Sequence, residues 1–250
     1  MYVIGVAGQC QNGKDVLANK LQELLNKRLS EGLCESPEDL WGRDSFAFGV
    51  KQVLAKMFGV DMDFIEKWKV TPEIPPGFDM NIRQSLQFIG DGFRKIRGSI
   101  WVDQLFSRFG TGQMRSAKII SDVRYINEFR RIKKEGGINI LIGRTKMLND
   151  DPNGSEAIIR PYAKWCLDVF DDAYACVDIA KNLYHGVADT ADSYRIYIEE
   201  RRRSGRVHCP VEYMNEFDLF VRNDGTIEDL YRVVDEQIVP FVEQYQFLGG

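Results

Sequence analysis

Short apolar runs alternate along this chain with longer stretches in which apolar residues recur at helical spacing. The first apolar run, from Tyr2 to Ala7, is partly β-branched, which is typical of a buried strand. From Val16 onward, leucines recur at helical spacing with polar residues between them, and this pattern predicts a helix that ends near Lys27. The chain is therefore expected to begin with a strand, a short loop and a helix.

The same two patterns continue to the C-terminus. Apolar runs predict further strands, and apolar residues at helical spacing predict further helices. Strands that alternate with helices indicate a parallel sheet with right-handed crossovers and helices on both faces, so we expect an α/β three-layer fold. The expected strands are 44–48, 117–121, 138–142 and 217–221, and the expected helices are 49–58, 61–69, 81–89, 100–109, 127–135 and 226–246.

The segment 144–213 departs from this rhythm. It is turn-rich and mostly helical in pattern, with charge runs such as Glu199 to Arg206. A chain of 250 residues accommodates one large domain or a core with inserted subdomains. We expect a core formed by 1–143 and 214–250 and a helical insert at 144–213.

The loop after the first strand carries the first candidate chemistry. Gly8, four further residues, Gly13 and Lys14 form the pattern G-x-x-x-x-G-K between a strand and a helix, which is the context of a phosphate-binding loop. Glycines let backbone N–H groups converge on a phosphate, the helix N-terminus adds partial positive charge, and the lysine adds a full charge. The expected nucleotide-binding residues are Gly8, Asn12, Gly13, Lys14, Asp15 and Val16.

Two carboxylates are candidate magnesium ligands. Asp15 stands where this loop usually has a serine or threonine that binds the metal, so either Asp15 holds Mg²⁺ through water or nucleotide and solvent hold it. Asp122 follows an expected buried strand, at the rim of the sheet, where it would hold a magnesium-bound water. Arg124 would neutralise a phosphoryl group there. The competing interpretation of Asp122 and Arg124 is an ordinary ion pair at a strand end.

Further stretches carry candidate ligands for a second substrate. Arg83 and Gln87 lie four residues apart and share one helix face, where they suit a phosphate and a base edge. Arg94 follows, and Trp101 either stacks on a base or, as is more common, belongs to the core. The arginines at 201–206 form either a lid over nucleotide phosphates or a solvated helix face.

Composition narrows the class of protein. A net charge of −4 and a pI near 5.4 give no general attraction to nucleic acid or to acidic membranes. No apolar stretch is long enough to span a bilayer and no signal peptide is evident, so we expect a cytoplasmic protein. Five scattered cysteines without C-x-x-C spacing indicate reduced thiols, and the two isolated histidines support neither a zinc site nor a Ser-His-Asp triad.

Together these motifs resemble the deoxynucleoside monophosphate kinases of tailed phages, members of the adenylate-kinase-like P-loop group. G-Q-C-Q-N-G-K-D resembles that family's loop, in which an aspartate follows the lysine. R-Q-S-L-Q-F-I-G followed by Trp101 is similar to its acceptor-region motif, and D-V-R-Y-I-N-E to its D-x-R-x-x-x-E. F-D-L-F-V-R-N-D-G-T-I-E-D-L resembles the closing motif, and His208 and Glu212 resemble a His…Glu pair with imperfect spacing.

The resemblance implies a P-loop kinase that uses ATP and Mg²⁺ to phosphorylate a deoxynucleoside 5′-monophosphate in the cytoplasm of a phage host. It also implies an acceptor-binding region at about 59–100. In two places the chain departs from the family: Val16 replaces the usual threonine, and the segment from 144 to 212 is longer. The insert is therefore a candidate lid, acceptor-specificity element or homodimer contact. The residues implied are Lys14, Asp122 and Arg124 for catalysis, Asp15 and Asp122 for metal, and Arg83, Gln87, Arg94, Trp101, Arg124 and Glu128 for the acceptor.

Two other functions fit the same residues. A kinase acting on a hydroxyl of a modified base in DNA would use the insert and its arginines to hold a polynucleotide, and its binding would depend steeply on salt. A non-catalytic nucleotide-binding module would keep the loop without turnover. The arginines retained around two expected sites argue against that last function.

Overall fold

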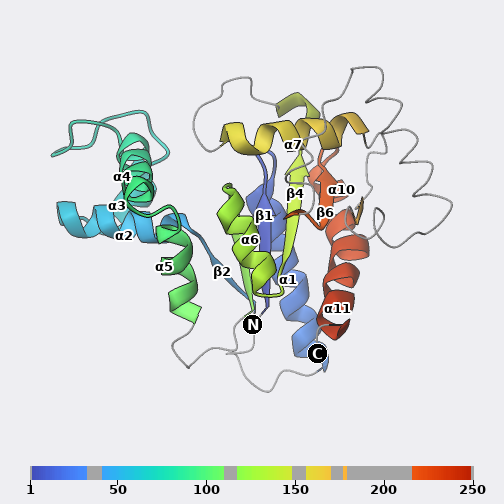
Figure 1. The fold of residues 1–250 in the computed structure, drawn as a ribbon. Coiled ribbons are helices and arrows are strands. Elements are labelled where there is room, and N and C mark those ends of the chain that lie inside the picture. The colour runs from blue at the N-terminus through green and yellow to red at the C-terminus, as the bar shows by residue number, and fades with distance from the viewer. Residues whose placement is uncertain are drawn as a thin grey trace. The chain divides into compact units, whose positions relative to one another are not determined.

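The computed structural model describes residues 2–32, 41–109, 117–147, 156–169, 177–178 and 216–248 (Figure 1). The chain divides into two compact units, Met1–Arg43 with Arg115–Gly250 and Asp44–Met114. Most of the expected insert, including its arginine cluster and the His208 and Glu212 pair, lies outside the described residues. The first unit contains the sheet, and the described elements of the second are mainly helices.

A six-stranded sheet forms the centre of the first unit, in the order β2-β3-β1-β4-β6-β5. β1 lies between β3 and β4 and is parallel to both, and β4 is parallel to β6. β5, at the edge, is antiparallel to β6. The expected parallel α/β sheet is thereby confirmed. The strands are β1 (Val3–Ala7), β2 (Gly42–Asp44), β3 (Lys118–Val123), β4 (Ile138–Gly143), β5 (Val177–Asp178) and β6 (Leu219–Arg222).

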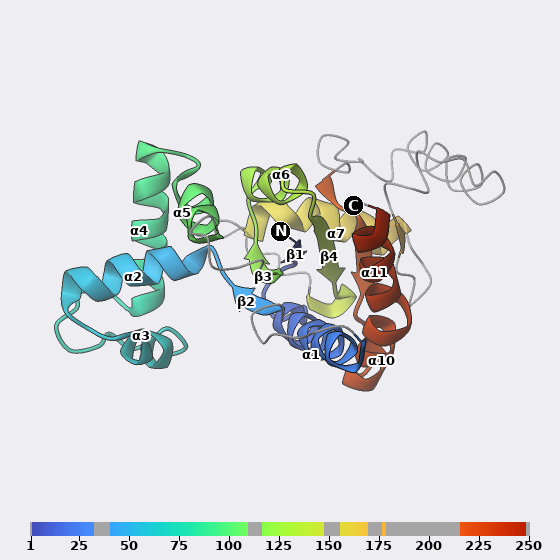
Figure 2. The same ribbon diagram turned by 90° about the horizontal axis from the view of Figure 1, so that it is seen from below.

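Helices cover both faces of this sheet (Figure 2). On one face, Leu17 of α1 and Val239 of α11 belong to the same buried cluster as Ile140 of β4. On the other face, the rings of Phe129 and Phe217 meet edge to face with centroids 4.8 Å apart. Because both faces are buried, the strands read as continuous apolar runs. The helical elements are α1 (Lys14–Gly32), α6 (Ile126–Lys134), a 3₁₀ turn (Thr145–Met147), α7 (Glu156–Val169), α10 (Ile227–Val233), a π-helical segment (Val234–Ile238) and α11 (Val239–Leu248).

The second unit packs its helices around a small core of its own. α4 begins with a reciprocal capping box, in which the side chains of Asn81 and Gln84 each accept from the other's backbone N–H. The expected acceptor-binding region, 59–100, falls within this unit. One buried cluster of this unit is formed by Leu54, Ile65 and Ile82. Its described helices are α2 (Ala47–Phe58), α3 (Met62–Trp68), α4 (Ile82–Ile96) and α5 (Ile100–Phe109).

The strand expected at 44–48 is wrong. β2 ends at Asp44, and α2 begins at Ala47. The Asp44 carboxylate accepts a hydrogen bond from the Ser45 N–H at 2.7 Å, a local contact that competes with strand pairing. The apolar residues that followed Asp44 in the sequence therefore start a helix instead of continuing the strand.

The helix expected to end at residue 89 continues to Ile96 through two glycines. Glycine in a helix interior costs about 1 kcal/mol relative to alanine, which is why the sequence pattern favoured a break there. Gly90 is buried in α4, and its carbonyl accepts a hydrogen bond from Trp101 Nε1 at 3.0 Å. Tertiary packing at this position outweighs the weak local propensity.

The described helices include none that is both long enough and apolar enough to cross a lipid bilayer. Cys10 is exposed and Cys166 is buried, and both are free thiols, as expected for the two cysteines that the structure describes. Cys34, Cys176 and Cys209 lie outside the described residues.

Candidate phosphate-binding site

The loop from Gly8 to Gly13 links the carboxyl end of β1 to α1 in the first unit. Its backbone passes through two positive-φ conformations, at Gln11 with φ of 63° and at Gly13 with φ of 93°. α1 then starts with a hydrogen bond from Leu17 N to Gly13 O at 2.9 Å. The first-turn N–H groups of a helix have no helical partners, and together with the helix dipole they favour an anion at this end of α1.

Close approach, as well as backbone conformation, accounts for the two glycines of the motif. A Cβ atom on Gly8 would lie 2.6 Å from Ile142 O, far inside van der Waals contact. A Cβ atom on Gly13 would lie 2.5 Å from Asn223 Nδ2. At Gly8 the neighbour is backbone at the end of β4 and cannot give way, whereas at Gly13 it is the end of the Asn223 side chain, which would have to move.

Asn223, directly after β6, is a site residue that sequence reasoning missed. Its Nδ2 donates to Asn12 O at 2.9 Å, and its backbone N–H donates to Gly143 O at 2.8 Å. In the sequence it is visible only as the start of an Asn-Asp-Gly turn and as part of the closing motif. No local pattern indicates its contact with a loop 211 positions earlier.

Lys14 is folded over the loop. The residue is 9% exposed, and its Nζ donates to Gln9 O at 3.0 Å. A buried ammonium group is costly unless it is paired and hydrogen-bonded. The structure therefore holds a positive charge against the loop at a place where a bound phosphate would stabilise it.

Buried polar atoms without partners gather at this loop. In the part of the chain that the structure describes, five buried side-chain nitrogen or oxygen atoms lack a hydrogen-bond partner, and three of these belong to Gln9 and Asn12. A fourth, Arg43 Nε, belongs to a side chain that contacts the first turn of α1. Each such atom costs about 1–3 kcal/mol. Their concentration here is typical of a functional site.

A polar cluster surrounds Asp15 in the first turn of α1. Ser121 Oγ donates to Asp15 Oδ1 at 2.7 Å, and the Arg43 guanidinium donates to the same oxygen at 3.1 Å. Arg43 also donates to Ser121 and Asn19. The Asp15 side chain is 74% exposed, so it remains accessible to a ligand. Val16 packs against the hydrophobic core and contributes no polar side-chain group.

The carboxyl end of β3 lies beside that of β1, so its polar residues belong to the same edge of the sheet. Asp122 and Arg124 are both half-buried there. Glu128 is 2% exposed, and its Oε2 accepts from Arg124 N at 2.7 Å and from Tyr125 N at 3.0 Å. Glu128 thus caps α6, and its expected role at the acceptor stays a prediction.

The described residues contain no group of three or more His, Cys, Asp or Glu that could hold a metal ion. Asp15 and Asp122 are the carboxylates that the sequence assigns to this edge. Mg²⁺ is commonly bound through one or two carboxylates, with phosphate oxygens and water completing its shell. Two carboxylates are fewer ligands than an all-protein cage needs, and this number fits a Mg²⁺ that arrives with a nucleotide and its water.

The remaining expected ligands lie in the second unit. Arg83 and Gln87 are both exposed on α4, as their four-residue spacing predicted for one helix face. Arg94, on the last turns of the same helix, contacts Asp91 at 3.5 Å. α4 therefore presents a cation and a carboxamide together to solvent, which suits a phosphate and the edge of a base.

Trp101 belongs to the core of the second unit. The residue is 3% exposed, and its ring centroid lies 5.5 Å from that of Phe93. Its Nε1 is engaged by Gly90 O. The burial of the residue and the engagement of its polar atom support the core alternative.

The sheet order, the glycine-bounded loop after the first strand and the lysine that opens α1 define the class of fold. They are the parts of a P-loop NTPase fold, an α/β three-layer fold with its phosphate loop at the carboxyl end of a central parallel strand. The expected fold class is confirmed.

Comparisons with known proteins do not extend this assignment of the fold class. No protein-family model matches the chain, and no curated protein sequence matches it. Among solved structures, the chain is similar to a dephospho-CoA kinase from Campylobacter jejuni, with 10% sequence identity, 98% of this chain and 99% of that chain covered, and a TM-score of 0.37. A likeness at this TM-score carries no argument, so the fold class rests on the strand order and the loop.

Proposed function

We propose that this protein is a P-loop kinase that transfers the γ-phosphoryl group of ATP to a deoxynucleoside 5′-monophosphate. The observation that carries the proposal is the loop from Gly8 to Lys14. It combines a positive-φ turn at Gly13, the N-terminus of α1 and a buried ammonium group within one short segment. This combination favours a polyphosphate over a neutral or cationic ligand.

At the donor site, the loop N–H groups would bind the inner phosphates and Lys14 the outer ones. Lys14 Nζ now donates to the Gln9 carbonyl. Because a hydrogen bond to an anionic oxygen is roughly twice as strong as one to a neutral acceptor, exchange of the carbonyl for a phosphate oxygen is favourable. Mg²⁺, when bound with the nucleotide, would neutralise charge on the β and γ oxygens, with Asp15 and Asp122 as its carboxylate neighbours.

At the acceptor site, Arg83 would bind the nucleotide phosphate and Gln87 the edge of the base, with Arg94 and Arg124 adding positive charge. An oxygen of the acceptor phosphate forms a new bond to the γ-phosphorus, while the bond from that phosphorus to the β–γ bridging oxygen breaks and ADP leaves. The acceptor phosphate is already anionic at neutral pH, so no strong general base is needed. Positioning and electrostatics then supply the rate.

In this proposal the region at about 59–100 binds the acceptor, and the insert at 144–213 is a lid over the nucleotides. Closure of a lid buries backbone, so amide hydrogen exchange at 199–206 should slow when an ATP analogue and the acceptor are bound together. Exchange that ignores both ligands would remove the insert from the proposed site.

The test of the proposed function is an ADP-release assay with every deoxy- and ribonucleoside monophosphate and with DNA oligomers. We expect turnover with at least one mononucleotide, little affected by salt. Turnover with DNA that falls steeply as salt rises would favour the kinase of a modified base instead. Binding of ATP with no turnover on any acceptor would favour the non-catalytic module, and no binding of ATP would refute the phosphate-loop interpretation.

A further inference from the structure

Two observations place the amide of Asn223 against the phosphate loop. Its Nδ2 donates to Asn12 O at 2.9 Å, and a Cβ atom on Gly13 would lie 2.5 Å from the same nitrogen. The residue is 6% exposed, so little solvent competes for this hydrogen bond. The side chain of Asn12, which has no partner of its own for either polar atom, does not hold the loop here. Asn223 therefore holds the Asn12 carbonyl, while the Asn12 N–H donates to Gln9 O at 3.3 Å within the loop.

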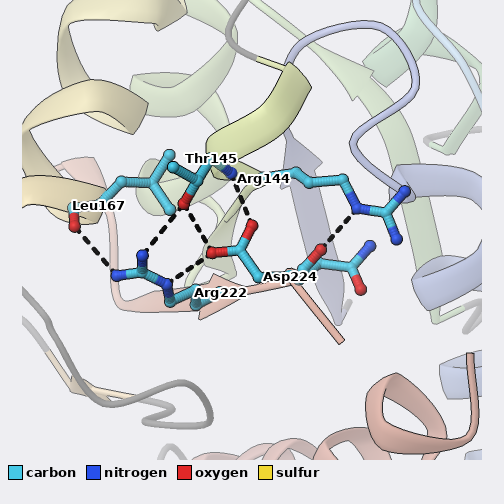
Figure 3. A network of polar contacts seen from close by, with 6 residues as sticks. Arg144, Thr145, Leu167, Arg222 and Asp224 are labelled. Atoms are coloured by element: carbon cyan, nitrogen blue, oxygen red, sulfur yellow. Dashed lines mark hydrogen bonds and ion pairs between the residues drawn. The ribbon is translucent and has the colours of Figure 1, made fainter. Parts of the chain in front are cut away.

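The turn that carries Asn223 is itself held by a network of hydrogen bonds that includes Arg144, Thr145, Arg222 and Asp224 (Figure 3). Arg144 Nε donates to Asn223 O at 2.7 Å. The Asp224 carboxylate accepts from Thr145 N at 2.7 Å, from Thr145 Oγ1 at 2.6 Å and from Arg222 Nε at 2.7 Å. Arg222 also donates to Leu167 O at 3.0 Å. Asn223 therefore lies in a turn that several hydrogen bonds hold in place.

Peptide geometry links this contact to phosphate binding. The peptide bond between Asn12 and Gly13 is trans, as are all the peptide bonds that the structure describes, so its C=O and N–H point in opposite directions. When Asn223 holds the Asn12 carbonyl, the Gly13 N–H must point away from Asn223. A phosphate loop works only when such N–H groups are directed at the anion before it arrives, because reorienting them on binding lowers affinity.

We propose that Asn223 is a positioning residue that sets the orientation of the Asn12–Gly13 peptide and thereby pre-forms the loop for phosphate. The inference rests on the proposed function, since it takes the ligand of the loop to be a polyphosphate. Asn223 does not touch the ligand in this proposal; it acts through the loop backbone. It extends the site beyond the G-x-x-x-x-G-K pattern and the stretches around Arg83 and Arg124, to a residue of the closing motif that was given no role.

The experiment compares Asn223→Ala with Asn139→Ala as a matched control. Asn139 is also fully buried in the first unit, and its Nδ2 also donates to backbone carbonyls, of Phe129 at 3.1 Å and Glu216 at 2.8 Å. It lies at the other end of β4, away from the loop. Both substitutions remove a buried carboxamide, so both should lower stability, but only Asn223→Ala should weaken phosphate binding.

Binding of ADP and of inorganic tripolyphosphate is measured by calorimetry at a temperature where circular dichroism shows every variant folded. Tripolyphosphate lacks a base, so an effect on it cannot come from a lost contact with adenine. We expect Asn223→Ala to raise both dissociation constants about five- to tenfold, as for loss of one organising hydrogen bond, and Asn139→Ala to leave them unchanged. Asn223→Ser, whose hydroxyl is too short to replace the contact, serves if the alanine variant does not fold.

The outcomes distinguish the positioning role of Asn223 from the proposed function of the protein. Equal dissociation constants for Asn223→Ala and the wild type would overturn the positioning role while leaving the proposed function intact. An equal loss in both asparagine variants would mean a general effect of destabilisation and would also overturn it. A wild type that binds neither ADP nor tripolyphosphate would refute the proposed function itself.

Discussion

Replacement of Gly13 by alanine tests the packing of the loop most directly. Two costs are expected. The φ of 93° at Gly13 lies in the left-handed region, which costs an L-residue about 1–2 kcal/mol. The new Cβ would also lie 2.5 Å from Asn223 Nδ2, so the amide must move and its hydrogen bond to Asn12 O is lost, at about 1 kcal/mol. We expect Gly13→Ala to lower the free energy of unfolding by about 2–3 kcal/mol.

Gly136→Ala separates these two costs. Gly136 belongs to the same unit and has a φ of 75°, but a Cβ atom there would have no neighbour within 4 Å. It should therefore show the conformational cost alone, about 1–2 kcal/mol. The assay is urea denaturation of the wild type and both variants, followed by circular dichroism, with the slopes compared so that a change in the unfolded state is detected.

A double-mutant cycle completes the test. If Asn223 causes the extra cost, Gly13→Ala should be less damaging by about 1 kcal/mol in an Asn223→Ala background, since residues in contact are not additive. Equal losses of stability in Gly13→Ala and Gly136→Ala would refute the close approach of Asn223 to the loop. So would strict additivity of the two substitutions.

The remaining predictions concern the charges. Lys14→Ala should lower kcat by at least about a hundredfold through loss of one transition-state contact, whereas Lys27→Ala, on the exposed part of α1, should leave it unchanged. Arg83→Ala should raise the KM for the acceptor, by an amount that corresponds to a loss of about 1.5–3 kcal/mol in binding free energy, with ATP affinity unaltered in a calorimetric titration. Burial raises the pKa of Asp224, but hydrogen bonds from Thr145 and Arg222 outweigh burial and hold that pKa below the ordinary value of 3.8. The ionised Asp224 therefore stabilises the folded protein above that pH, and this contribution is lost as the pH falls below it. Asp224→Asn should be less stable than the wild type at pH 7. The difference in free energy of unfolding between the two, measured by urea denaturation, should disappear in acid.

The sequence alone determined the central part of this protein. The apolar run before Gly8, the leucines after Lys14 and the spacing of the glycines are local signals, and the structure has the strand, loop and helix where they predicted them. Alternation of strands and helices was likewise enough for the parallel three-layer fold, because a parallel connection needs a helical crossover. The shared face of Arg83 and Gln87 followed from helical spacing alone.

Tertiary structure decided what local patterns do not encode. It placed Trp101 in a core instead of a binding surface, carried α4 through Gly90, and engaged Glu128 as a cap for α6. It also brought Arg43 against Asp15 and Asn223 against the phosphate loop, contacts between segments 28 and 211 positions apart. The physical reason is the same for both of these last contacts. They join residues that are distant in sequence and meet only after the chain has folded, so the residues next to them in sequence do not predict the contact.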